Sequence, residues 1–238
     1  MLMARRAQAK SAADYWQDTS DYFTAPLHWE PEDWGTAGGI ALGVAAAYSI
    51  DGRVHRHFAP DDPTGSGGHG VRDAMPLAAM FAGTFAVGAL GDEQYLDTGL
   101  DMGEAVALSF VSAHALKLVL GRERPYQTDS KDRFGKGGSS FPSGHVTAAF
   151  AAAQVLADEI PADQWGWRVV AYGLAGTTAY ARLHGNAHWL SDTVAGAALG
   201  IVSGRFVSNR RADCTTKVSM SLAPMNRGAL VAFALSFH

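Results

Sequence analysis

Six apolar segments, each free of Asp, Glu, Lys and Arg, place the strongest constraint on the fold of this 238-residue chain. Their uninterrupted lengths are 17, 17, 12, 12, 13 and 12 residues, and they are rich in alanine and glycine. Short segments of this composition are typical of helices that pack closely against one another. We therefore expect an all-α fold built from six helices. The segments are residues 34–50, 75–91, 105–116, 146–157, 169–181 and 193–204.

The two ends of the chain differ from this helical core. Residues 1–33 are expected to form an N-terminal helix and loop extension, and residues 34–208 the core. In the tail, apolar residues alternate on both sides of a Met-Asn-Arg-Gly turn, which predicts a small C-terminal β-hairpin over residues 215–237. An exposed hairpin edge can pair with another chain, so a homodimer through the hairpin is a hypothesis. With 47% hydrophobic residues, one domain over 1–238 is expected.

Lys117 and Arg124 lie in the string KLVLGRERP, at the end of the third apolar segment. On a helix, two residues seven apart lie almost on one line, so both cations can face one site. Gly121 and Pro125 mark the expected end of this helix. The alternative is a solvated basic helix end that interacts with the negative end of the dipole.

Ser143, Gly144 and His145 lie where a glycine- and serine-rich loop runs into an alanine-rich segment, GKGGSSFPSGHVTAAF. A helix that begins here leaves several backbone N–H groups without partners beside its positive dipole end, which favours anion binding. Ser143 adds a hydroxyl donor, Gly144 lets the backbone come close, and His145 projects from the first turn. The alternative is an ordinary serine N-cap followed by a histidine without a role.

Arg182, His188 and Asp192 lie in the string ARLHGNAHWLSD. A carboxylate one helical turn after a histidine can accept the Nδ1–H and leave Nε2 as a nucleophile. Alternatively, Asp192 caps the next helix and His188 is a buried histidine with satisfied hydrogen bonds. A metal site at His184 and His188 is disfavoured, because no HExxH motif is present and Asp192 is the one nearby carboxylate.

The three strings, in this order, resemble the signature motifs of the type 2 phosphatidic acid phosphatase superfamily. That family includes bacterial class A acid phosphatases and vanadium haloperoxidases. The resemblance implies a six-helix bundle of the phosphatidic acid phosphatase type and a phosphatase that hydrolyses phosphate monoesters through a phosphohistidine, with neither metal nor cofactor. The substrate it implies is a phosphorylated lipid or a small phosphate ester. The six-segment layout favours lipids such as phosphatidic acid, phosphatidylglycerol phosphate or a polyprenyl pyrophosphate.

The resemblance also assigns roles to individual residues. The phosphoryl oxygens would be held by Lys117, Arg124, Ser143, Gly144 and Arg182. The catalytic residues would be His188 as the nucleophile, His145 as the acid for the leaving oxygen, and Asp192, which orients His188. One residue departs from the family pattern: Ala181 stands where a serine usually precedes the arginine, so one hydroxyl contact is missing.

Two other function classes share these residues. A vanadium haloperoxidase would bind vanadate in the same pocket, with His188 as its ligand. A non-catalytic module that binds anions or lipids would hold phosphate without turnover, and Ala181 makes this alternative more credible.

Bulk properties limit the partners and the compartment. The net charge of -4 and the pI near 6.1 argue against a nucleic-acid partner. Spanning a bilayer takes about 20 apolar residues; these segments are shorter, and the mean hydropathy of the whole chain is only -0.02. We therefore expect a soluble protein or one with peripheral membrane contact. By analogy with the family, the location would be periplasmic or membrane-associated, and no signal peptide is visible.

Overall fold

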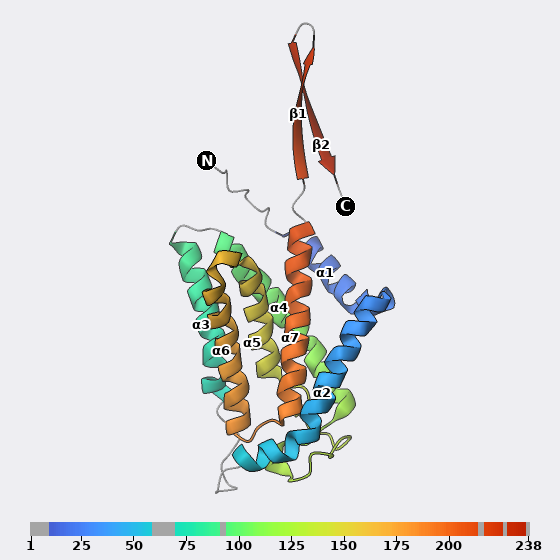
Figure 1. Cartoon of the computed structure of the whole chain (residues 1–238), viewed down its shortest axis with the longest axis vertical. Coiled ribbons are helices and arrows are strands. Elements are labelled where there is room, and N and C mark those ends of the chain that lie inside the picture. Colours follow the sequence, from blue (N-terminus) through green and yellow to red (C-terminus); the bar gives the residue numbers. More distant parts are fainter. Residues whose placement is uncertain (1–9, 59–69, 91–93, 214–216, 226–227, 237–238) are drawn as a thin grey trace.

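The computed structural model describes residues 10–58, 70–90, 94–213, 217–225 and 228–236 (Figure 1). The expected all-α fold is confirmed over the described residues up to 213, that is 10–58, 70–90 and 94–213. These ranges contain seven α-helices instead of six, because the N-terminal extension forms a helix of its own. The helices are α1 (Ala12–Thr24), α2 (Pro31–Phe58), α3 (Gly70–Ala89), α4 (Gln94–Leu120), α5 (Gly144–Glu159), α6 (Trp165–His184) and α7 (Leu190–Asp213).

The first two helices begin at clear sequence signals. Ser11 caps α1, because its hydroxyl accepts the N–H of Asp14 at 3.3 Å and the Asp14 carboxylate accepts the N–H of Ser11 at 2.7 Å. Helix α2 begins at Pro31 and has two acidic residues in its first turn, where they interact favourably with the helix dipole. It continues to Phe58, past the predicted end at residue 50.

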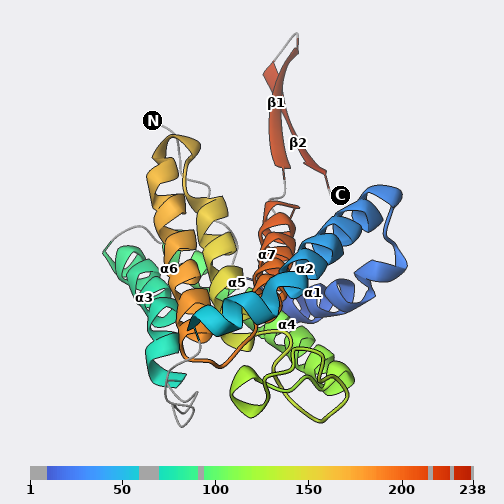
Figure 2. The same ribbon diagram turned by 60° about the horizontal axis from the view of Figure 1, so that its bottom comes forward.

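Helix α5 is the central helix of the bundle, and α3, α4, α6 and α7 pack around it (Figures 1 and 2). Its side chains are small, so its neighbours can approach closely. The fully buried alanines of α5 are Ala149, Ala151, Ala152 and Ala153. They join Met102 and Leu108 of α4 and Ala175 of α6 in the hydrophobic core.

Helix α7 packs on α5 through a row of glycines, Gly196, Gly200 and Gly204. A Cβ atom at Gly196 would lie 2.8 Å from the Ser143 carbonyl oxygen, and one at Gly204 would lie 2.7 Å from that of Ala151. A Cβ atom at Gly200 would lie closer still to the carbonyl oxygen of Thr147 in α5. The row therefore sets the distance between α5 and α7 and brings the start of α7 beside the start of α5.

The connection between α4 and α5, residues 121–143, crosses one end of the bundle (Figure 2). The C-terminal half of α2 and the turn from α6 into α7 lie at the same end. Tyr48 of α2 reaches this connection, because its hydroxyl donates to Asp132 and its carbonyl oxygen accepts the Lys131 ammonium at 2.9 Å. All three motif strings therefore reach this end of the molecule.

After α7 the chain forms two antiparallel strands, β1 (Lys217–Met225) and β2 (Gly228–Ser236). Their Cα partners run from Lys217↔Ser236 to Met225↔Gly228. The predicted hairpin spans residues 215–237, and its residues 215–216, 226–227 and 237 lie outside the described residues. How the hairpin packs, and whether it forms a homodimer, stay predictions.

Candidate active site

The cations of the first string, Lys117 and Arg124, both reach Ser139 in the connection before α5. The Lys117 ammonium donates to the carbonyl oxygen of Ser139 at 2.8 Å and to that of Pro142. The Arg124 guanidinium donates to the Ser139 hydroxyl at 3.3 Å. Neither cation has a carboxylate within ion-pair distance in the described part of the chain. Their positive charge is therefore available to a bound anion.

The helix ends before Gly121, where its end was expected, so the helical spacing predicted to align Lys117 and Arg124 does not apply. Helix α4 ends at Leu120, and Gly121 has a φ of 51°, in the left-handed region that glycine adopts readily. Arg124 lies beyond this break in an extended conformation, with φ -83° and ψ 157°. The two side chains are brought together by the path of the connection, not by helical spacing.

The second string surrounds the first turn of α5. The Ser143 N–H donates to the Asp192 carbonyl oxygen at 3.0 Å, which joins this string to the third. The Ser143 hydroxyl is buried, caps no N–H of α5, and has no hydrogen-bond partner among the described residues, so the ordinary N-cap alternative does not apply. A Cβ atom at Gly144 would lie 3.9 Å from Lys117 Cε, and His145 is half-buried in the same turn.

In the third string, His188 and Asp192 lie side by side at the start of α7. His188 is only 3% exposed, and its Nδ1 lies 3.4 Å from Oδ2 of Asp192, slightly longer than a hydrogen bond. Catalytic hydrogen bonds are often long without substrate and shorten when it binds. Arg182 is buried in the last turn of α6.

The surroundings of His188 keep its imidazole neutral. Burial lowers its pKa, Asp192 partly offsets this, and the nearby positive charges of Arg124 and Arg182 lower it further, to about 4. Burial raises the pKa of Asp192, but its contact with His188, the charge of Arg122 and the hydrogen bond from Ser140 outweigh burial and lower the pKa. At neutral pH the pair is therefore an ionised carboxylate beside a neutral ring.

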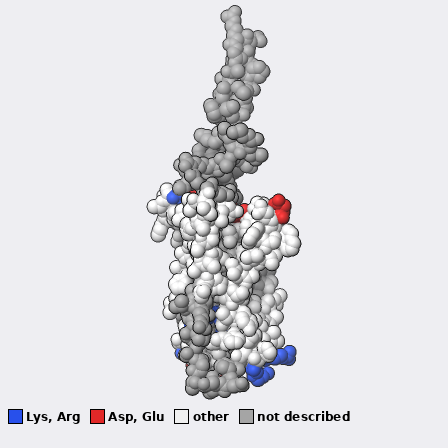
Figure 3. Space-filling model, turned by 90° about the vertical axis from the view of Figure 1, so that its left-hand side faces the viewer, with Lys and Arg blue, Asp and Glu red and all other residues white. Residues whose placement is uncertain are grey.

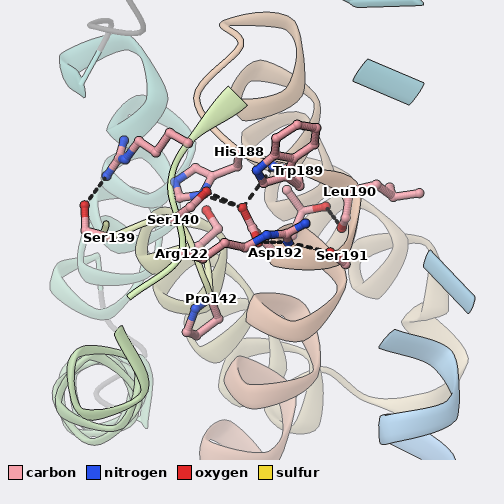
Figure 4. Close-up of polar contacts among 12 residues, drawn as sticks. Arg122, Ser139, Ser140, Pro142, His188, Trp189, Leu190, Ser191 and Asp192 are labelled. Carbon is pink, nitrogen blue, oxygen red and sulfur yellow. Dashed lines mark hydrogen bonds and ion pairs between the residues drawn. The ribbon is translucent and has the colours of Figure 1, made fainter. Parts of the chain in front are cut away.

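Asp192 is held by more partners than its sequence string contains (Figure 4). Its Oδ1 accepts Arg122 Nη1 at 2.6 Å. Its Oδ2 accepts the Ser140 hydroxyl at 2.5 Å and the Trp189 N–H at 2.9 Å. These contacts fix the plane of the carboxylate and leave Oδ2 on the side of His188.

Sequence reasoning missed Arg122, Ser140 and Asp51 of α2, which contacts Arg122. Arg122 stands between the two cations of the first string, but nothing in the string distinguishes it from a surface residue. Asp51 carried one weak signal, because it is a single acidic residue directly after an apolar segment.

The metal alternative at His184 and His188 finds no support in the geometry. His184 is exposed at the end of α6, with its ring 5.8 Å from that of Tyr180. The described residues contain no group of three or more His, Cys, Asp or Glu side chains that could hold a metal ion.

Comparison with known proteins identifies the family of this fold and site. The model of the PAP2 superfamily matches residues 98–215, which include α5, α6, α7 and most of α4. Over 99 residues the chain is 35% identical to the lipid A 1-phosphatase of Porphyromonas gingivalis. These residues make up 42% of this chain and 20% of that relative. No solved structure matches the chain. The family match covers all three motif strings, and residues 98–215 belong to the PAP2 superfamily, the type 2 phosphatidic acid phosphatases.

Proposed function

We propose that this protein is a phosphatase that hydrolyses a phosphate monoester, with a phosphorylated lipid as its substrate. The observation that carries the proposal is the convergence of three distant strings on one buried histidine. Lys117 and Arg124 reach the same serine, Ser143 bonds the main chain of Asp192, and Asp192 lies 3.4 Å from His188. Membership of the PAP2 superfamily supports the same reaction.

The proposed nucleophile is Nε2 of His188. It attacks phosphorus, the bond from phosphorus to the leaving oxygen breaks, and His145 gives that oxygen a proton. Water then attacks the phosphohistidine, which releases inorganic phosphate and restores the free imidazole. A ring with a pKa of about 4 has its lone pair available at neutral pH, and Asp192 stabilises the positive charge that develops on it.

The proposed binding groups for the phosphoryl oxygens are the three cations and the start of α5. A transferring phosphoryl group spreads negative charge over its oxygens, and positioned cations and N–H groups stabilise this charge. Lys117 and Arg124 suit this role because the described residues give them oxygen partners but no carboxylate. Arg182, the Ser143 hydroxyl and the backbone at Gly144 complete the proposed set.

We also propose that the protein contacts a membrane. One helical stretch among the described residues, Tyr95–Gln127, is long and apolar enough to cross a bilayer, and only 28% of its apolar window is buried. The sequence estimate missed it because Asp101 and Glu104 interrupt the apolar run. The face in Figure 3 is mostly uncharged between basic residues at its lower end and acidic residues at its upper end. Exposed apolar side chains on α3 and α6 include Phe85, Trp165, Trp167 and Val170.

Exposed apolar side chains next to Lys117, such as Leu118 and Val119, favour a lipid phosphate over a small soluble ester, because the acyl chains can stay in the membrane. The lipid A 1-phosphatase among the relatives supports this class of substrate. The panel that tests it contains lipid A, phosphatidic acid, phosphatidylglycerol phosphate, a polyprenyl pyrophosphate and p-nitrophenyl phosphate. We expect at least one lipid to be hydrolysed much faster than p-nitrophenyl phosphate, with a chelator present throughout.

The matched variants for this assay are His188→Ala and His184→Ala. His184 is a neighbouring but exposed histidine, so its removal should leave the rate within about twofold. Removal of His188 should abolish phosphate release. Full activity in His188→Ala, or no release from any ester by the wild type, would refute the proposed function. The membrane contact is tested by whether the protein sediments with membranes prepared at low salt, before and after a carbonate wash. We expect it in the membrane pellet, and its complete release at low salt would contradict the contact.

A further inference from the structure

Arg122 is a buried cation whose five N–H donors all have partners. It is 0% exposed, and it lies between the two proposed phosphate-binding cations of the same string. Nε and Nη2 donate to the Lys131 carbonyl oxygen at 3.1 and 2.9 Å. The remaining donors reach Ser191 Oγ at 2.8 Å, Asp192 Oδ1 at 2.6 Å and Asp51 Oδ2 at 2.8 Å. With every donor engaged, Arg122 is not free to bind substrate.

The two carboxylates that Arg122 bridges come from different helices. Asp192 belongs to α7 and faces His188 with its other oxygen. Asp51 belongs to α2 and is also fully buried. It accepts the Ser191 N–H at 2.8 Å and the Ser191 hydroxyl at 2.6 Å, so it also anchors the first turn of α7. The turn held in this way begins directly after His188 and Trp189.

Three aromatic rings enclose the guanidinium of Arg122. Its Cζ lies 5.3, 4.9 and 5.2 Å from the ring centroids of Tyr48, Phe134 and Trp189. The rings exclude water, which strengthens both ion pairs and attracts the cation to the ring faces. Burying three charges this way is a poor means of stabilising a fold, since well-packed apolar side chains often do as well or better. Their arrangement on one catalytic carboxylate points to a role in positioning.

We propose that Arg122 and Asp51 are positioning residues for the phosphatase reaction, which hold Asp192 in the orientation that directs His188 at phosphorus. This inference rests on the proposed function. Asp51 fixes one arm of the guanidinium, Arg122 occupies Oδ1 of Asp192, and Oδ2 is thereby turned toward Nδ1 of His188. Neither residue touches the phosphoryl group. Both should affect the rate of phosphoryl transfer more than substrate binding.

Helix α2 gains a functional part through this arrangement. The family match begins at residue 98, so Asp51 and Tyr48 lie in a part of the chain outside it. Asp51 and Arg122 are 71 positions apart in the sequence. The support of the site therefore depends on a helix that the family match does not include.

The experiment compares Asp51→Asn with Asp18→Asn. Asp18 is also a buried, ion-paired carboxylate, but it lies at the opposite end of α7, where it pairs with Lys10 at 3.0 Å and Arg210 at 2.8 Å. Steady-state kinetics on the best substrate of the panel and the melting temperature are measured for both. For Asp51→Asn we expect kcat to fall about 10- to 100-fold with KM within about threefold, as for the outer partners of other catalytic groups. For Asp18→Asn we expect a lower melting temperature and an unchanged kcat.

Two further variants keep the inference open to refutation if Asp51→Asn does not fold. Ser191→Ala removes one link between Asp51 and Arg122 while both charges remain, and should lower kcat about threefold. Arg122→Lys keeps the charge, but a lysine cannot bridge two carboxylates, so we expect its kcat to fall below that of the wild type. A wild-type kcat in Asp51→Asn or Arg122→Lys, while His188→Ala is inactive, overturns this inference and leaves the proposed function standing. A wild type that hydrolyses no ester overturns both.

Discussion

Both ends of helix α7 contain buried charges, but the cations at the two ends have different partners. At the end away from the site, Arg210 pairs with Asp18 at 2.8 Å and with Asp21 at 2.9 Å, and Arg211 pairs with Asp101 at 2.8 Å. These pairs join α1, α4 and α7. At the site end, Lys117 and Arg124 contact carbonyl and hydroxyl oxygens instead. One end is an ion-pair network that holds helices together, whereas at the other end Lys117 and Arg124 keep positive charge for an anion beside the ion pairs of Arg122.

We expect the largest difference in activity and stability between the two ends of α7 when one cation is removed at each end. Arg124→Gln should lower kcat/KM about 100- to 1,000-fold, as the loss of one transition-state donor commonly does, with little change in stability. Arg210→Gln should do the reverse, because it removes one of the two cations that pair with the buried Asp18, and should lower the unfolding free energy by about 1–3 kcal/mol. Kinetics and urea unfolding of both variants test this. Comparable losses of activity in the two would contradict the contrast.

The two ends should also respond to acid in different pH ranges. Burial lowers the pKa of His188 from 6.5 to about 4, so the unfolded chain takes up a proton before the folded one does. The contribution of His188 to folding stability is therefore fully present above pH 6.5, and it falls by about 3 kcal/mol as the pH drops from 6.5 to 4. Burial raises the pKa of Asp18, but Arg210 and Lys10 outweigh it and lower the pKa below 3.8. The contribution of Asp18 should thus be lost only below that pH.

Urea unfolding across this pH range, with wild type and His188→Ala side by side, separates the two contributions. The variant should lose the slope between pH 6.5 and 4 and keep the decline below pH 3.8. An unchanged slope in His188→Ala would mean that the ring is not buried in its neutral form.

The glycine row joins the two ends, and Gly200 lies at its middle. Gly200→Ala would push a Cβ atom into a backbone carbonyl of α5, and should lower the unfolding free energy by about 1–3 kcal/mol. It should also lower activity by moving His188 away from His145. Gly173 on α6 is the matched control, because no atom lies within 4 Å of its Cβ position, and Gly173→Ala should stabilise by about 0.5–1 kcal/mol. Equal melting temperatures for the two variants would contradict this account of how α7 packs on α5.

The smallest effect concerns the residue that departs from the family pattern. Ala181→Ser restores one hydroxyl beside Arg182, and one hydrogen bond is worth about 1 kcal/mol, or roughly a fivefold lower KM. The kcat should stay within about twofold, because the nucleophile and the cations are unchanged. A rise in kcat with constant KM would show instead that the missing hydroxyl acts in the transition state.

The sequence predicted the three strings correctly as neighbours, because each carries its own chemical pattern. It placed the helix boundaries less well. Helix α4 was cut to residues 105–116 by the charges of Asp101 and Glu104, yet the helix runs from Gln94. Lys10 pairs with Glu104 at 2.7 Å and lies 3.7 Å from Asp101, which lets these charges lie within a packed helix. Such partners are invisible in a local reading of charge.

The support of the site escaped prediction for a related reason. Asp51 has no motif around it, and its partners Arg122 and Ser191 are 71 and 140 positions away. Only the packing of α2 on α7 brings them together. Arg124 shows the opposite case, because it lies near Lys117 as expected, although the path of the connection and not helical spacing brings it there.

The central claim is that His188 receives a phosphoryl group at the end of the bundle where Lys117 and Arg124 have no carboxylate partner among the described residues. Trapping the intermediate tests it most directly, with a substrate labelled in the phosphoryl group, rapid quenching in alkali, where phosphohistidine is stable, and digestion. The account predicts label on the peptide that contains His188, none in His188→Ala, and loss of the label in acid. Turnover without a labelled peptide, or label on another residue, would contradict it.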